Sequence, residues 1–127
     1  MIVILIDPNF QTVFRFELDG FDDFHDSISY VLETENWYCL KDVDDTHVMY
    51  VIKDGANDPG NQAFVICETG ENIFGKALIC KLSKRDYLSP INCTLSVKKA
   101  KDLIVFCNRE ESQIYREFER NETDSLL

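Results

Sequence analysis

Short apolar runs separated by polar turns constrain this chain more than any other feature, because they have the length of β-strands. The first run, Met1 to Ile6, is joined to an alternating segment by Asp7-Pro8-Asn9, whose composition is typical of a turn. Side chains that recur at period two share one face of a strand. Residues 1–18 therefore predict a β-hairpin. The residues on its alternating face are Phe10, Thr12, Phe14, Phe16 and Leu18.

The same pattern continues along the chain. The runs NWYCLKDV and HVMYVIK flank Asp44-Asp45-Thr46 and predict a second hairpin, and DGANDPGN, residues 54–61, predicts a loop. After it the order is strand, turn, strand, with strands expected in AFVICE, GKALICKLS, INCTLSV and DLIVFC. The predicted structure is mainly β.

Two segments have helical spacing instead. Phe21, Phe24, Ile28, Val31 and Leu32 recur on one side of a helix expected from about Phe21 to Glu33, with Asp19 as its N-cap. A second helix is expected after Asn108, where Ile114, Tyr115 and Phe118 share a side, and residues 121–127 are expected to fray. We therefore expect residues 1–120 to form a single α+β domain. Its mostly antiparallel, twisted sheet would have six to eight strands, one helix packed on a face and a C-terminal helix at the edge.

The five cysteines raise the question of reactive chemistry. Cys67, Cys80, Cys93 and Cys107 follow one another at intervals of 13, 13 and 14 residues, each in or at the end of an apolar run. That interval is about one strand plus one turn, so we interpret these residues as packing positions of a regular antiparallel meander. With no signal-peptide pattern or membrane-length apolar run, we expect a cytoplasmic protein with free thiols and no membrane association.

Other site chemistry finds little support. Zinc sites need paired Cys or His ligands a few residues apart, and no such pair occurs. The segment from Asp42 begins like a calcium loop, but His47 and Lys53 stand where Gly and Glu are required. We assign no catalytic residue, metal or cofactor, and a binding protein is favoured over an enzyme. A long-range pairing of a cysteine with His25 or His47 stays open.

Charge is the most informative global property. The net charge is −10, and residues 1–50 carry eleven acidic against two basic residues. This charge disfavours direct binding to nucleic acid and suits a protein partner with a basic surface, although it also serves solubility. The predicted partner-binding acidic face comprises Asp19, Asp22, Asp23, Asp26, Glu33, Asp42, Asp44 and Asp45. The alternative is a small anionic ligand such as a nucleotide, bound in the 76–101 region by Lys81, Lys84, Arg85, Lys98, Lys99 and Lys101.

The stretch VICETGENIFGKALICKL, residues 65–82, resembles the central signature of a small family of unknown function found in phages, plasmids and conjugative elements. Ile66-Cys67-Glu68, Gly70, Gly75 and Leu78 carry the resemblance. Ile79-Cys80 replaces an Asn-Arg pair of that family, so no role is transferred for the pair. The resemblance implies an accessory protein of a phage or mobile element. Together with the charge, it suggests a non-enzymatic protein that inhibits a host or defence protein through its acidic face. Whether the protein is an oligomer stays open at this stage.

Overall fold

A computed structural model describes residues 1–18, 23–83 and 90–110. It is an α+β structure built mostly from antiparallel strands. The elements in chain order are β1 (Ile2–Asp7), β2 (Thr12–Glu17), α1 (Phe24–Leu32), β3 (Trp37–Asp42), β4 (His47–Ile52), the 3-10 helix η1 (Gly55–Asn57), β5 (Ala63–Ile66), β6 (Asn72–Phe74), β7 (Ala77–Leu82), β8 (Pro90–Ile91), α2 (Val97–Asp102) and β9 (Ile104–Cys107). Neither described helix has the length and apolar character needed to traverse a lipid bilayer.

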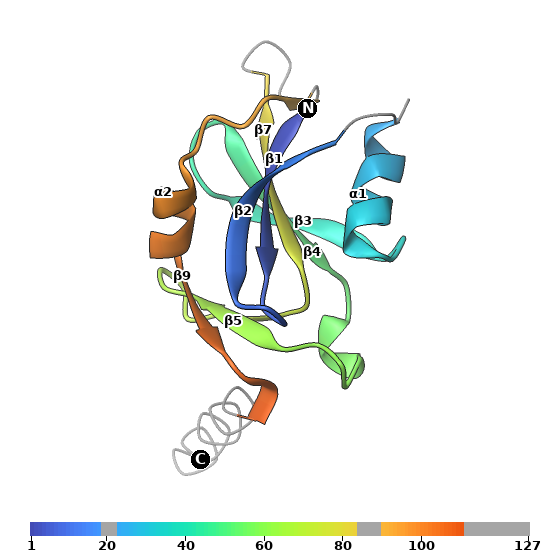
Figure 1. Cartoon of the computed structure of the whole chain (residues 1–127), viewed down its shortest axis with the longest axis vertical. Helices are drawn as coiled ribbons and strands as arrows, with labels where there is room; N and C mark the ends of the chain where they lie inside the picture. Colours follow the sequence, from blue (N-terminus) through green and yellow to red (C-terminus); the bar gives the residue numbers. More distant parts are fainter. Residues whose placement is uncertain (19–22, 84–89, 111–127) are drawn as a thin grey trace, which may run out of the picture.

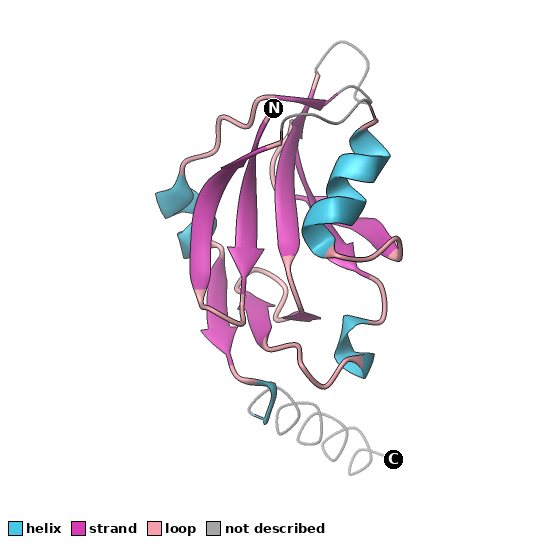
Figure 2. Ribbon diagram, turned by 45° about the vertical axis from the view of Figure 1, so that its right-hand side comes forward, coloured by secondary structure: helices cyan, strands magenta, loops and turns pink. Residues whose placement is uncertain are grey.

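The larger sheet has six strands, in the order β2-β1-β7-β4-β3, with β8 paired to β7 (Figure 2). Both predicted hairpins are confirmed: β1 pairs with β2, and β3 pairs with β4, each antiparallel. β7 joins the two hairpins by pairing with β1 on one side and β4 on the other. Its first four residues are all buried, as expected for a central strand covered on both faces.

The predicted single meander is wrong. The strands divide between two sheets, because β5 pairs with β6 and β9 to form a separate three-stranded sheet while β7 enters the six-stranded one. The regular spacing of the cysteines therefore does not reflect a regular sheet. Cys80 lies within β7 of the six-stranded sheet, whereas Cys107 ends β9 of the three-stranded sheet. The expected strand INCTLSV is instead mostly a loop, residues 92–96, between the two-residue β8 and the start of α2.

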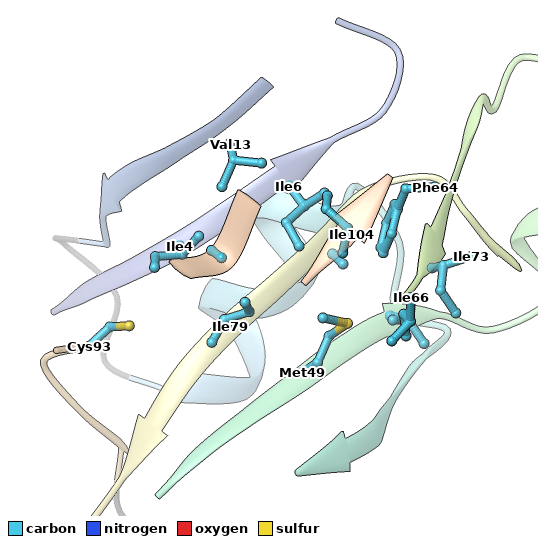
Figure 3. Packing of buried hydrophobic residues seen from close by; sticks show 13 residues of the cluster. Ile4, Ile6, Val13, Met49, Phe64, Ile66, Ile73, Ile79, Cys93 and Ile104 are labelled. Atoms are coloured by element: carbon cyan, nitrogen blue, oxygen red, sulfur yellow. The ribbon is translucent and has the colours of Figure 1, made fainter. Parts of the chain in front are cut away.

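The six-stranded sheet is the middle layer of the structure, with α1 and α2 on opposite sides of it (Figure 1). Alternate residues of β1 belong to different cores: Ile4 and Ile6 face α2 and the small sheet, and Val3 and Leu5 face α1. Figure 3 shows the first core, where Phe64 and Ile104 of the small sheet pack against Met49 and Ile79. Each fully buried aliphatic or aromatic side chain stabilises the fold by roughly 1.5–3 kcal/mol.

The helices differ from the prediction in extent. α1 begins at Phe24 and not at Phe21, and its N-cap is Asp23, whose side chain accepts a hydrogen bond from the backbone N–H of His25 at 2.7 Å. Asp19 was therefore wrong as the N-cap. Ser96 caps the unpredicted α2 by accepting from the N–H of Lys99 at 3.1 Å. The predicted C-terminal helix lies largely, and the frayed tail entirely, outside the described residues.

Candidate functional site

The predicted acidic face is divided in the structure. Asp23, Asp26 and Glu33 are exposed at the start, in the first turn and at the C-cap of α1. Asp42, Asp44 and Asp45 are exposed at the end of β3 and in the following turn. The other two predicted members, Asp19 and Asp22, lie outside the described residues. The acidic residues thus form two groups on different elements.

Asp44 belongs to a polar cluster around the buried His47, on the α2 side of the sheet. Its carboxylate accepts hydrogen bonds from the N–H groups of Thr46 and His47 at 2.9 and 2.8 Å, and both oxygens lie 2.9 Å from His47 Nδ1. Partial burial works to raise the pKa of Asp44, but these hydrogen bonds outweigh burial and hold the pKa below its usual value. By strand alternation His47 shares the face of Met49 and Val51, which belong to the α2-side core.

His47 connects the β3–β4 turn to the loop before α2. Its Nε2 accepts the backbone N–H of Thr94 at 3.3 Å, and the Thr94 hydroxyl lies 3.5 Å from the same nitrogen. Lys81 Nζ donates to that hydroxyl at 3.0 Å. An Asp–His–hydroxyl series has the composition of a catalytic triad, but here the lone pair of Nε2 is already engaged by a backbone N–H. The cluster therefore has a structural role: it connects the β3–β4 turn to the loop before α2.

The described members of the predicted anion-binding set lie away from α1. Lys98, Lys99 and Lys101 are exposed on α2, and Lys81 lies near the end of β7 beside Thr94. Lys84 and Arg85 are outside the described residues. Of the described members, Lys81 belongs to the polar cluster around His47, and Lys98, Lys99 and Lys101 lie together on the short helix α2.

The cysteines are only in part the packing residues we predicted. Cys80 and Cys93 are buried, whereas Cys67 and Cys39 are exposed, so the packing interpretation was wrong for Cys67. Burial raises the pKa of Cys80 far above its ordinary value, with smaller contributions from Cys93 and Cys39. Burial also raises the pKa of Cys93, and partial burial of the sulfur together with the charge of Asp42 raises the pKa of Cys39, so these thiols are not poised as thiolates. Within residues 1–18, 23–83 and 90–110, no group of three His, Cys, Asp or Glu residues is placed to hold a metal ion.

A polar pocket lies at the C-terminal end of α1. Four segments that are distant in the sequence build it: the β1–β2 turn, the end of α1, the loop from β4 through η1, and the β6–β7 turn. Its volume is about 330 Å³. Its lining residues are Asn9, Leu32, Glu33, Thr34, Ile52, Asp54, Gly55, Asp58, Asn61, Gly75 and Lys76. We call this cavity the acidic pocket.

Hydrogen bonds fix the loops of the acidic pocket. Asn61 Nδ2 donates to the carbonyl of Gly55 at 2.9 Å, and Asn9 Oδ1 accepts the N–H of Gln62 at 2.8 Å. Arg109, which follows β9, donates to the carbonyls of Asp58 (2.9 Å) and Ala56. Its guanidinium carbon lies 5.5 Å from the centre of the Phe74 ring, within range of a cation–π contact. The pocket therefore has an ordered wall.

Two glycines allow the close approach of these loops. A Cβ on Gly55 would lie 2.3 Å from the carbonyl oxygen of Phe74. Gly75 has a φ of +88°, and a Cβ there would meet Ile52 Cδ1 at 2.9 Å. Glu33 and Asp54 also line the pocket in the left-handed region, with φ of 59° and 56°. Left-handed backbone is uncommon outside glycine and persists only where surrounding contacts hold it.

The charge of the acidic pocket favours a cation. Glu33, Asp54 and Asp58 contribute three carboxylates against the single ammonium of Lys76, whose Nζ lies 3.7 Å from Glu33 Oε2. The last turn of α1 contains no basic residue, so the negative end of the helix dipole is not offset there. The pocket thus combines a net negative charge with an unbalanced dipole, and an ammonium or guanidinium group suits it best.

Sequence reasoning did not find this pocket. Residues 54–61 were correctly predicted as a loop, but their Asp and Asn residues were interpreted only as turn formers. Comparison of the chain with protein-family models, with curated proteins and with solved structures returned no match.

Proposed function

We propose that this chain is a non-enzymatic binding protein that recognises a basic region of a partner protein through the α1 side of its sheet. The observation that carries the proposal is the acidic pocket, which Glu33, Asp54 and Asp58 line together with one lysine at the negative end of α1. Asp23 and Asp26 extend the negative surface along the exposed side of the helix. Complementary charge accelerates association and selects partners of the opposite sign.

The resemblance of residues 65–82 to a family from phages and mobile elements supports an accessory role in such an element, including inhibition of a host or defence protein. Many proteins of that kind carry basic surfaces for nucleic acid, which an acidic protein can occupy in its place. In this proposal the partner is a cytoplasmic protein and nucleic acid is a competitor of the chain, not its ligand.

A panel of purified DNA-binding proteins tests the proposal. Binding of the full chain is measured by biolayer interferometry from about 50 to about 300 mM salt, where screening strengthens markedly. We expect binding to some members, weakening with salt and competing with duplex DNA. The variant Asp54→Asn/Asp58→Asn should bind more weakly, because it removes two carboxylates of the acidic pocket. It should still fold, since Asn tolerates the left-handed backbone at position 54 and, at position 58, retains the Oδ1 that accepts the N–H of Gly60.

The matched control is Asp42→Asn/Asp45→Asn, which removes the same charge at the end of β3 and in the turn that follows it. Equal losses in the two variants would show that net charge, and not the acidic pocket, drives association. Binding that ignores salt, or no binding by any member, would remove the proposal.

A further inference from the structure

An open cleft adjoins the acidic pocket along the side of α1. It measures about 500 Å³ and shares two lining residues, Glu33 and Lys76, with the pocket. The remaining lining residues are Leu5, Phe16, Ser29, Tyr30 and Val31, most of them apolar or aromatic. Cleft and pocket thus form a continuous binding surface with an apolar part and an acidic part.

Aromatic side chains are exposed around this cleft. Tyr30 of α1 is 67% exposed and Phe14 of β2 is 39% exposed. Phe14 and Phe16 lie on the α1 side of β2 by strand alternation, and their ring centres are 6.3 Å apart in an edge-to-face arrangement. The helix packs over β7, so the β2 part of the same sheet face keeps aromatic surface available. Aromatic residues beside charged ones are typical of protein-recognition surfaces.

The cleft and the acidic pocket meet at the C-terminal end of α1. Glu33, the C-cap, and Lys76 line both, whereas Tyr30 lines the cleft alone. In an extended segment, the nearest side chains that point to the same side belong to residues i and i+2, about 6.6 Å apart. One apolar side chain and one basic side chain, separated by a single residue, would therefore suit two adjoining sites of this kind.

We infer that the cleft and the acidic pocket bind one extended segment of the partner protein, in which an aromatic or large aliphatic residue and a lysine or arginine are separated by one residue. This inference rests on the proposed function and specifies what its partner presents. The apolar side chain packs on Phe16 and Tyr30, and the cation replaces water beside Asp54 and Asp58. The charge of the pocket selects a basic segment over an acidic one.

Selection from a display library of random peptides on the immobilised full chain tests the inference. Enrichment of peptides that combine an apolar and a basic residue at this spacing would support it. Enrichment of basic peptides with no apolar preference would leave the proposed function standing and overturn the two-part surface. If no basic peptide is enriched, both fail.

Variants then locate the binding of a selected peptide. Tyr30→Ala should weaken binding about tenfold, as expected for an aromatic anchor, while alanine keeps the helix propensity of α1. The matched control Tyr38→Ala removes a tyrosine that is 45% exposed on β3, at the opposite edge of the sheet. Circular dichroism confirms that both variants fold. Equal effects of the two substitutions, or a peptide footprint on α2 in nuclear magnetic resonance spectra, would overturn the inference.

Discussion

Replacing Asp44 by alanine should destabilise the protein far more than replacing its neighbour Asp45. The Asp44 carboxylate accepts two backbone N–H groups of its own turn and the Nδ1–H of His47, whose side chain is only 5% exposed. The substitution would leave the buried imidazole N–H without its acceptor, whereas water can replace the acceptor of the exposed turn groups.

The structure sets the size of the effect. An unsatisfied buried donor costs about 1–3 kcal/mol, and each lost turn hydrogen bond costs about 0.5 kcal/mol. Because the Asp44 side chain is 46% exposed, solvent screening reduces the charge contribution, and a total of about 2–3 kcal/mol is expected. At roughly 4 °C per kcal/mol for a chain of this length, the melting temperature should fall by about 8–12 °C. Urea unfolding followed by the fluorescence of Trp37, the single tryptophan, measures the same change.

The pH dependence gives a second check. The pKa of Asp44 is lowered in the folded state, so its stabilising effect is present above the unfolded pKa and is lost as pH falls through the folded value. The stability gap between the wild type and Asp44→Ala should therefore be constant near neutral pH and shrink below about pH 4. A gap that persists unchanged in acid, or an equal loss in the control Asp45→Ala, would refute the reasoning.

Three further predictions concern the core and the loops. Gly75→Ala should lower the free energy of unfolding, measured in urea, by about 1–3 kcal/mol more than Gly70→Ala does. Both glycines have positive φ, but only Gly75 has atoms close to where the new Cβ would lie. Cys67 should react with a thiol reagent in the native protein, whereas Cys80 should react only after unfolding, as mass spectrometry of the labelled chain would show. Burial, with smaller contributions from Cys80 and Cys39, raises the pKa of Tyr50 to about 12. In an ultraviolet titration, one tyrosine should therefore ionise about two pH units above the ordinary pKa of a tyrosine.

Local pattern was sufficient to predict the hairpins and the main helix. Period-two alternation with a Pro-containing turn predicted β1 and β2, and 3.6-residue spacing predicted α1. The exact start of the helix was not predictable because Asp19 and Asp23 have the same capping chemistry, and only the backbone conformation selects Asp23. A signal for α2 was present in Val97, Ala100 and Leu103, which recur every three residues on its packed side, but the expected strand obscured it.

Long-range pairing was not predictable in the same way. β5 and β7 have similar apolar sequences, yet β5 pairs with β9 and β7 enters between β1 and β4. Nothing within either strand specifies that choice, because it depends on which apolar faces the whole chain can cover. The acidic pocket was missed for the same reason, since its walls come from four loops whose proximity follows from the strand order.

The strand order also changes what the net charge means. A charge of −10 distributed evenly would attract a basic partner from every direction. In the described residues, however, Asp23, Asp26 and Glu33 lie at α1 on one side of the six-stranded sheet, whereas the three lysines of α2 lie on the other side, together with the Asp44–His47 pair. On the proposed function, a basic partner would be attracted toward α1 and repelled by the lysines of α2. This asymmetry would orient the encounter before any contact forms and favour the C-terminal end of α1, where the cleft and the acidic pocket meet.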